Sequence, residues 1–290
     1  MIQKWPGRTH EINNKVPSAL VYQGRSPNDV KEWGFRCLRS ERKKEWFKQW
    51  LDPERIERFR ERALDNNPPT LEEVRKYYRD YLACLYKHVS TEIRKYIGRW
   101  DGKRVQFIFS LPSTLTKPAI VQELRELVIE AGFGEGGHRH TVEFSLTEPE
   151  AAAVYTIKDT SVDMRIGEIM LVCDAGGGTT DLAILESVGD EEGRPELREL
   201  TVAEGRAIGS TDIDSAFEDL VDERLELITP PLDDRIPWTM MQGAEFLGWK
   251  CAFGQSGEMP RTIAIKVPMV DSSYDSREAG IQRGKMLFTQ

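Results

Sequence analysis

The chain has 290 residues, of which 39% are hydrophobic, and its 40 Lys and Arg residues against 48 Asp and Glu residues give a net charge of −8. This length favours about two domains with a sizeable core. Because neutralising a phosphate backbone needs a basic face, the charge balance excludes nucleic acid as the main ligand. No apolar run approaches the roughly 18 residues of a membrane span, and residues 1–20 lack the pattern of a secretion signal. We therefore expect a cytoplasmic protein with no membrane partner.

The cysteines and histidines give no sign of a disulfide or metal framework. The cysteines are far apart and form no C-x-x-C pair: Cys37, Cys84, Cys173 and Cys251. We expect buried, reduced thiols, as in other cytosolic proteins. His138 and His140 fall in the glycine-rich stretch 134–140, which we interpret as a solvated connection rather than a metal site.

The first hundred residues change from short apolar stretches to helical periodicity. Prolines and glycines in residues 1–37 indicate edge strands and turns. From Ser40 the apolar spacing predicts helices, with a restart at Asp52-Pro53. A longer helix is predicted from Thr70, whose hydroxyl forms a capping box with Glu73, to a stop at Gly98.

An alternation of strand and helix follows. A buried strand is predicted over 104–111, a helix over Ala119–Ala131 and a second strand over Thr141–Leu146. The segment Thr147–Ala153 then starts a tight helix, and Glu148 is predicted at its N-cap. A structural cap and a catalytic role both explain Glu148 at this point.

The stretch Leu171–Asp181, followed by a second apolar run, predicts a β-hairpin with a glycine-rich tip. Because glycine adopts positive φ without a steric penalty, Gly176, Gly177 and Gly178 can direct successive N–H groups into an anion-binding nest. Two carboxylates beside such a nest would repel a bare polyphosphate, so Asp174 and Asp181 indicate a hard cation such as Mg²⁺. The alternative is an ordinary glycine-rich turn with acidic flanks.

After the hairpin the pattern predicts a strand over Glu196–Ala203, a turn and a helix capped by Ser210 and Thr211. A helix start of this kind offers N–H groups and hydroxyls to an anion, although ordinary capping also explains it. The remaining segments are a short helix and two strands: Ala244–Phe253, Thr262–Val267 and Lys285–Thr289. The chain contains no Walker A loop, no G-x-G-x-x-G helix opening and no G-x-S-x-G elbow, so phosphate binding would have to use the hairpin.

Three spaced segments together resemble the nucleotide-binding domain of the 70-kDa heat-shock chaperones, within the actin, hexokinase and chaperone ATPase superfamily. Asp174–Asp181 is similar to the second phosphate motif of the family, Thr147–Ala153 to its connecting motif and Gly209–Asp214 to its glycine-rich turn. The order and spacing agree across residues 100–225. The wording of the connecting motif and the Trp-rich first hundred residues look like the divergent, atypical branch of the family, of the kind common in fungal genomes.

The resemblance implies a division of roles among the candidate catalytic residues. Asp174 and Asp181 would orient waters on Mg²⁺, and Glu148 would help position the attacking water. The catalytic lysine of the family comes from the lobe formed here by residues 20–100, where Lys48 is the candidate.

The resemblance also implies the residues that would bind ATP or ADP. The hairpin tip would hold the β- and γ-phosphates through Gly176, Gly177, Gly178, Thr179 and Thr180. The opposite lobe would touch phosphate through Gly209, Ser210 and Thr211. Lys250 stands where an adenine-side lysine is expected.

The sequence also departs from the family pattern. The first phosphate motif, an Asp-x-Gly-Thr-Thr hairpin, would precede Trp5-Pro-Gly7 and is not in the sequence, and neither is the C-terminal adenosine motif. Thr180 replaces a usual Phe and Ser210 a usual second Gly. Because half of the phosphate donors are missing, we expect weak nucleotide binding and impaired hydrolysis.

We therefore predict an α/β protein with an actin-like ATPase fold of two ribonuclease-H-like lobes, the second incomplete. The first lobe would span 1–165, with its core in 1–20 and 100–165 and a helical insertion at about 21–99. The second would span 166–290, with the hairpin core in 166–208 and an outer subdomain in 209–290. The predicted function is that of a Mg-dependent ATP-binding domain of an atypical chaperone, with client or co-chaperone proteins as further partners.

Two other classes remain open from the sequence. The first is a nucleotide-independent interaction or scaffold protein that keeps the fold for its surfaces. The second is a small-molecule kinase of the same superfamily, which would need a catalytic Asp facing a sugar, and no residue is identified for that role.

Overall fold

The computed structural model shows a mixed α/β protein with several helices and several small sheets. It describes residues 2–7, 12–23, 29–37, 43–45, 47–51, 53, 56–57, 69–98, 100–159, 164–189, 195–201, 204–206, 208–255 and 260–289. The chain divides into two compact units, Met1–Ile208 and Gly209–Gln290. No helix formed by the described residues is long and apolar enough to cross a membrane.

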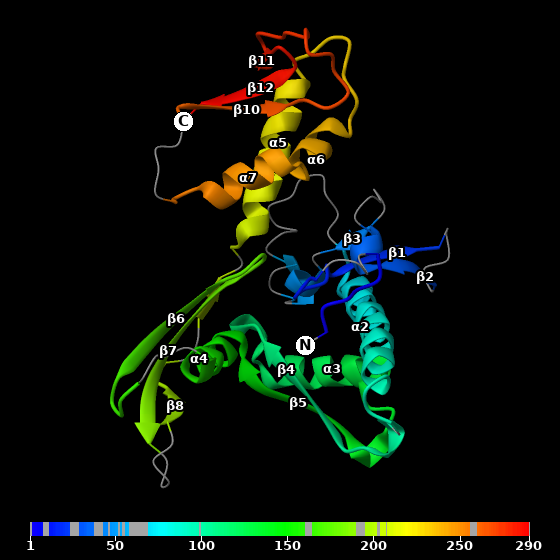
Figure 1. Ribbon diagram of the computed structural model, residues 1–290, viewed down its shortest axis with the longest axis vertical. Helices are drawn as coiled ribbons and strands as arrows, with labels where there is room; N and C mark the ends of the chain where they lie inside the picture. Colours follow the sequence, from blue (N-terminus) through cyan, green and yellow to red (C-terminus); the bar gives the residue numbers. More distant parts are fainter. Residues whose placement is uncertain are drawn as a thin grey trace. The chain divides into compact units, whose positions relative to one another are not determined.

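The first unit begins with a small antiparallel sheet beside a long helix (Figure 1). The sheet has the order β2-β1-β3 and is followed by a 3-10 helix, and its elements are β1 Ala19–Tyr22, β2 Val30–Trp33, β3 Lys44–Glu45 and η2 Phe47–Leu51. The helix α2, Leu71–Arg94, starts with the predicted capping box, in which the Thr70 hydroxyl oxygen accepts the Glu73 N–H at 3.2 Å. Its apolar stripe packs into the largest core, around Leu20, Val74 and Val128.

A parallel strand pair lies at the centre of the first unit. β4, Val105–Leu111, pairs with β5, His140–Thr147, and α3, Pro118–Val128, provides the crossover. Phe107 and Phe109 pack beneath this pair with Phe133. The chain leaves β5 directly into α4, Glu148–Asp159.

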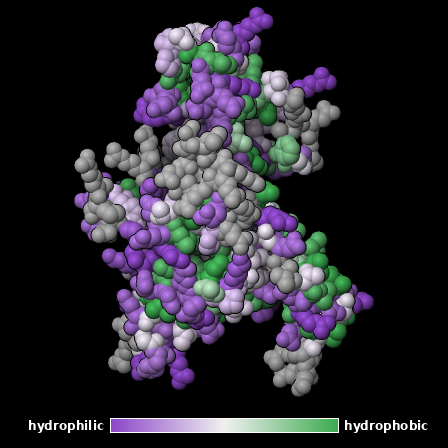
Figure 2. Space-filling view, turned by 180° about the vertical axis from the view of Figure 1, so that it is seen from behind, coloured by the Kyte–Doolittle hydropathy of each residue, from purple (hydrophilic) through white to green (hydrophobic). Residues whose placement is uncertain are grey.

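The predicted hairpin forms the edge of a further antiparallel sheet. β6, Ile169–Ala175, pairs with β7, Thr180–Gly189, which also pairs with β8, Pro195–Glu199, and with β9, Glu204–Arg206. Helix α4 covers one face, where Ala153 packs with Ala183 and Leu185. Hydrophobic residues gather over this sheet at the lower right of the space-filling view (Figure 2).

The second unit packs three helices against a small sheet. The helices are α5 Ser210–Leu225, α6 Ile236–Met241 and α7 Ala244–Ala252, and the strands are β10 Thr262–Lys266, β11 Ile281–Gln282 and β12 Lys285–Thr289. Strand β12 lies in the middle and pairs antiparallel with both neighbours. Phe217 of α5 stacks on Phe246 of α7 with ring centroids 4.0 Å apart, which joins two helices within the core of this unit.

The helices differ from prediction mainly at their ends. The helix predicted over Ala119–Ala131 ends at Val128 and continues as a wider turn to Phe133. Gly132 in this turn has a φ of 108°, and a Cβ there would lie 2.7 Å from the Tyr86 ring, so only glycine closes the turn. The long helix ends at Arg94 rather than near Gly98, because Tyr96 and Ile97 are exposed and gain nothing from continuing.

Other predictions are corrected or fall outside the described residues. Lys44–Glu45 form a short strand and Phe47–Leu51 a 3-10 helix, where an α-helix was predicted. Most of the helix predicted after Asp52, and Val202 and Ala203 at the end of the strand predicted over Glu196–Ala203, lie outside the described residues.

The predictions for side-chain exposure are also corrected in part. His140 is buried against Trp100 and not part of a solvated loop. Two of the four free cysteines, Cys173 and Cys251, are exposed where buried thiols were predicted. The predicted lobe boundary at residue 165 stays a prediction.

Candidate nucleotide and metal site

Thr147, and not Glu148, caps helix α4. The Thr147 N–H and hydroxyl both donate to Glu150 Oε2, at 2.6 and 2.9 Å, and the Glu150 N–H donates weakly to the Thr147 hydroxyl at 3.4 Å. This is the reciprocal arrangement of a capping box. The predicted N-cap role of Glu148 is therefore wrong, because its neighbours already satisfy the orphan donors. Glu148 occupies the first position of the helix and its carboxylate is free for another partner.

That partner is Lys48, which lies a hundred residues earlier in the sequence. The Lys48 ammonium donates to Glu148 Oε1, so the structure brings two of the four predicted catalytic residues into contact. The Lys48 side chain is 46% exposed and that of Glu148 is 20% exposed. An ion pair this exposed contributes about 0–1 kcal/mol to stability. Stability alone is thus a weak reason for joining these two segments.

Tyr78 of α2 completes the surroundings of Glu148. Burial, and next the negative charge of Glu148, raise the pKa of the Tyr78 phenol to about 12. The Glu148 carboxylate therefore has a cationic partner, Lys48, and a neutral, half-buried phenol ring near it. Both Lys48 and Tyr78 come from the region that precedes the central strands.

The two predicted metal-binding aspartates face each other across the hairpin. Asp174 of β6 is directly opposite Asp181 of β7 in the register. The Gly176 N–H donates to Thr179 O and the Ser187 N–H to Glu168 O, which makes Asp174 and Asp181 a hydrogen-bonded pair of the ladder. Cross-strand partners share one face, so the two carboxylates lie on the side covered by α4.

Asp181 is almost fully buried, with 1% of its surface exposed. Its Oδ1 accepts the backbone N–H of Ser113 at 3.0 Å. Gly205 of β9 lies opposite Asp181 on the other side, and a Cβ at Gly205 would approach this oxygen to 2.7 Å. The close approach of Gly205 is therefore what makes room for the carboxylate.

The site lies at the carboxyl ends of the parallel strands. Leu111 of β4 is opposite Thr147 of β5, so Ser113 and Glu148 both follow directly after paired strand ends. Because Ser113 binds Asp181, the hairpin carboxylates and the Glu148 helix start are anchored at the same edge. Ligand sites in α/β proteins occur at such edges.

The aspartate pair fits a hard cation held largely through water. Like charges placed opposite each other on a sheet are destabilising, and a cation between them would relieve this. The Ser113 hydroxyl is buried beside Asp181 and has no hydrogen-bond partner among the described residues, which leaves an oxygen for a bound water. Mg²⁺ commonly uses one or two carboxylates and keeps several waters. No cluster of three or more His, Cys, Asp or Glu residues suited to a metal occurs in the described part of the chain.

The hairpin tip uses part of its donors internally. The Gly176 N–H is donated to Thr179 O at 2.8 Å, and Gly176 does not have the positive φ expected of a nest. The Thr180 hydroxyl donates to Ile208 O at 2.8 Å. Gly177 and Gly178 do not have positive φ either, so the predicted nest conformation is wrong for all three glycines. The phosphate-binding role of Gly177, Gly178 and Thr179 stays a prediction.

In the second unit, the residues predicted to touch nucleotide form their own cluster. Gly209 is the N-cap of α5, so Ser210 and Thr211 are its first helical residues and not the predicted caps. The Lys250 ammonium donates to Ser210 O at 2.7 Å and to Asp214 Oδ1 at 2.6 Å. Lys250 thus joins α7 to the first turn of α5.

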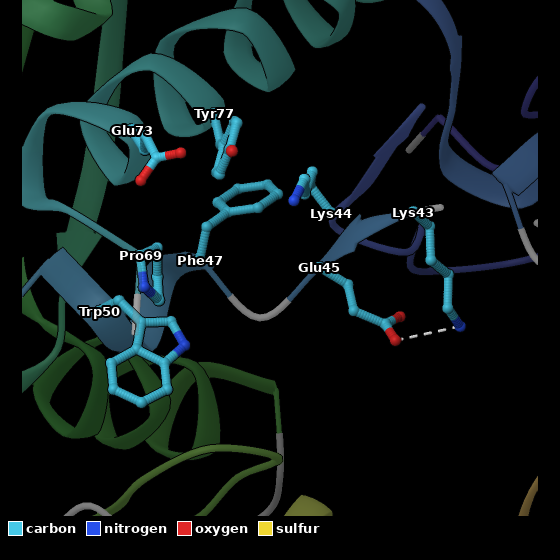
Figure 3. A pocket seen from close by; sticks show the side chains of 8 residues that line it. All are labelled: Lys43, Lys44, Glu45, Phe47, Trp50, Pro69, Glu73 and Tyr77. Carbon is cyan, nitrogen blue, oxygen red and sulfur yellow. Dashed lines mark ion pairs between the residues drawn. The ribbon is translucent and has the colours of Figure 1, made fainter. Parts of the chain in front are cut away.

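A separate pocket of about 370 Å³ lies between η2 and α2 (Figure 3). Aromatic and charged side chains line it, and none of them is a predicted site residue: Lys43, Lys44, Glu45, Phe47, Trp50, Pro69, Glu73 and Tyr77. Lys43 pairs with Glu45 at 3.0 Å, and Glu73 accepts the Thr70 N–H at 2.9 Å. Its charges are thus largely satisfied within the pocket wall.

Sequence reasoning missed three residues of the site. The pattern Thr147-x-x-Glu150 is a readable capping box and would have released Glu148 from the cap. Ser113 and Gly205 carry no comparable signal, because their roles depend on a contact between segments far apart in the sequence.

Comparisons with known proteins add no family assignment. No protein-family model matches the chain, and no curated protein matches its sequence.

Proposed function

We propose that this chain is a Mg-dependent ATP-binding domain with an actin-like ATPase fold, related to the atypical 70-kDa heat-shock chaperones. The observation that carries the proposal is the contact between Lys48 and Glu148. Glu148 belongs to the segment that resembles the connecting motif, and Lys48 is the candidate from the lobe that supplies the catalytic lysine of the family. The ion pair joins them at the edge where Asp181 is anchored.

In this proposal the carboxylates have two roles. Asp174 and Asp181 would hold Mg²⁺ through water, and the bound ion would neutralise charge on the phosphates. The Ser113 N–H fixes the orientation of Asp181. Glu148 would orient the attacking water, and the ion pair with Lys48 would hold the Glu148 carboxylate in place. Catalysis of phosphoryl transfer depends mainly on such positioning and charge neutralisation.

The internal hydrogen bonds of the hairpin tip support weak binding. The Gly176 N–H and the Thr180 hydroxyl would have to leave Thr179 O and Ile208 O before donating to phosphate. Because each such exchange replaces one hydrogen bond by another, its net gain is small. We propose low affinity and slow hydrolysis on this ground.

Calorimetric titration with ATP tests the proposal. We expect binding to the parent chain that requires Mg²⁺ and disappears with a chelator, and we expect Asp174→Asn to abolish the Mg²⁺ requirement. The matched control is Glu186→Gln, which removes one carboxylate from the same hairpin at a position that pairs with Arg198 at 2.5 Å. Equal thermal stability of the parent and Asp174→Asn chains with Mg-ATP, and no heat of binding, would exclude the proposal.

A nucleotide-independent interaction module is the second candidate. The exposed apolar face of β6, with Ile169 and Leu171 as its largest side chains, favours it. This second function predicts that Mg-ATP neither binds to the chain nor stabilises it. It also predicts association with a protein through the exposed face of β6.

A further inference from the structure

Strand β6 exposes an unusual apolar face. Its residues alternate along the strand, and the outward ones are Ile169, Leu171, Cys173 and Ala175. Ile169 is 64% and Leu171 is 66% exposed. On the neighbouring strand, Leu182 lies opposite Cys173 and is also exposed. The other side of β6, with Met170 and Val172, packs against the core under α4.

The backbone of the same strand is open on one edge. Strand β6 ends the order β6-β7-β8, and no other described strand pairs with it. The even-numbered residues of β6 bond to β7, as the bonds at Glu168 and Gly176 establish. The N–H and C=O groups of the odd-numbered residues therefore point to the open edge. The same four residues thus present both apolar side chains and backbone groups.

This edge carries few of the features that usually prevent strand pairing. Soluble proteins protect an open edge with lysine, proline, a bulge or an inward-pointing charge. Residues 169–175 contain no lysine and no proline, and their register with β7 runs without a bulge. The one charge is Asp174, which points inward to the face that α4 covers and is the single protective feature of this strand. An exposed, regular and apolar edge of this kind favours addition of another strand.

We propose that β6 pairs antiparallel with β6 of a second copy of this chain, about a two-fold axis near Val172. In this register Leu171 of each copy lies opposite Cys173 of the other, and Ile169 lies opposite Ala175. The two sheets then join into one, and the apolar faces form a continuous surface across the axis. A two-fold interface of this kind closes on itself and leaves neither β6 edge open.

The sequence of β6 explains why a second copy fits. Every pair on the exposed face is apolar with apolar, which stabilises a sheet. On the other face Asp174 lies opposite Met170 of the second copy, so the two aspartates do not face each other. Antiparallel pairing also brings the odd-numbered residues of both strands together, and these are the residues with outward backbone groups. The pairing does not depend on nucleotide, so it stands or falls separately from the proposed function.

Sedimentation of the full chain tests the proposal. We expect a dimer for the parent and a monomer for Leu171→Lys, because the lysine would place a charge opposite Cys173 of the other copy on each side of the axis. The matched control is Leu247→Lys on α7, where the leucine is 54% exposed, and this variant should remain a dimer. Circular dichroism of both variants should match the parent.

Cross-linking provides a second measurement in a nearly native chain. In the Cys251→Ser variant, Cys173 is the exposed thiol among the described residues, since Cys37 is buried and Cys84 half-buried. In the proposed register the two Cys173 side chains are diagonal neighbours, about 7–8 Å apart. A short bismaleimide should therefore give a covalent dimer, and adding Cys173→Ser should abolish it. A monomeric parent, or a dimer that survives Leu171→Lys and does not cross-link through Cys173, overturns the proposal.

Discussion

The first turns of α4 and α5 both have an acidic residue three positions after the N-cap, but the two helix ends are capped in different ways. In α4 the Thr147 side chain and Glu150 satisfy each other and the first turn. In α5 the N-cap is Gly209, which has no side chain, and the Asp212 carboxylate accepts the Gly209 N–H at 2.7 Å. One start is therefore capped from both directions, and the other from one direction only.

This difference decides which polar groups remain available at each helix start. Because Thr147 and Glu150 close the α4 cap, Glu148 is free to pair with Lys48. At α5 the corresponding first residue is Ser210, whose carbonyl receives Lys250 from α7. The α4 start thus offers a carboxylate, whereas the α5 start lies beside a cation. The roles expected from the sequence, positioning water at the first start and contacting phosphate at the second, stay predictions.

The largest expected effect is on the rate of ATP hydrolysis, and it distinguishes the role of Glu148 from that of Glu150. With Glu148→Gln we expect ATP hydrolysis to fall by roughly a hundredfold or more, as for loss of a positioned acid or base. Folding stability should change little, because the ion pair with Lys48 is partly exposed. Glu150→Gln is the matched control and should keep hydrolysis while it weakens the cap. Single-turnover hydrolysis and thermal melting of both variants distinguish the two roles, and equal hydrolysis would contradict the division.

The next effect concerns the anchoring of the hairpin beside the α4 start. Asp181→Ala removes the acceptor of the buried Ser113 N–H. Leaving a buried donor without a partner costs about 1–3 kcal/mol of unfolding free energy. Urea denaturation measures this loss. Asp174→Ala should cost less, since Asp174 is only half-buried, and a larger loss at Asp174 would show that Asp181 is not the structural anchor.

A smaller effect compares the two caps directly. Thr147→Ala should destabilise the protein by about 1 kcal/mol, because serine or threonine caps are much better than alanine. Gly209→Ser should instead stabilise by a few tenths of a kcal/mol, since a hydroxyl is slightly better than glycine at this position. The extended φ of −153° at Gly209 accommodates any residue. Calorimetric melting checks both signs, and a loss of stability in Gly209→Ser would argue for a tight contact at that backbone.

The sequence predicted the strands and helices around the site better than the contacts between them. Periodicity placed β4, β5 and the strand pair around Asp174 and Asp181, because these segments bury one face and alternate regularly. Family resemblance selected Lys48 and Glu148, but nothing in the spacing showed that they touch. The positions of Ser113 and Gly205 could not be predicted, since each is fixed by packing against Asp181 from another part of the chain.

The smallest effect is a pH dependence of folding stability that arises from Tyr78, which lies near Glu148 at the start of α4. Burial and the nearby Glu148 raise the pKa of Tyr78 to about 12 in the folded chain, above its ordinary value of 10.0. The unfolded chain therefore loses this proton first as the pH rises. The folded state keeps the full contribution below pH 10.0 and loses it progressively as the pH approaches 12. We therefore expect the melting temperature of Tyr78→Phe, measured relative to that of the parent, to be higher between pH 10.0 and 12 than at neutral pH. In a Glu148→Gln background this pH-dependent difference in melting temperature should be smaller, because the charge that disfavours the phenolate is gone. A difference in melting temperature that does not change with pH would show that Tyr78 ionises as readily in the folded chain as in the unfolded chain.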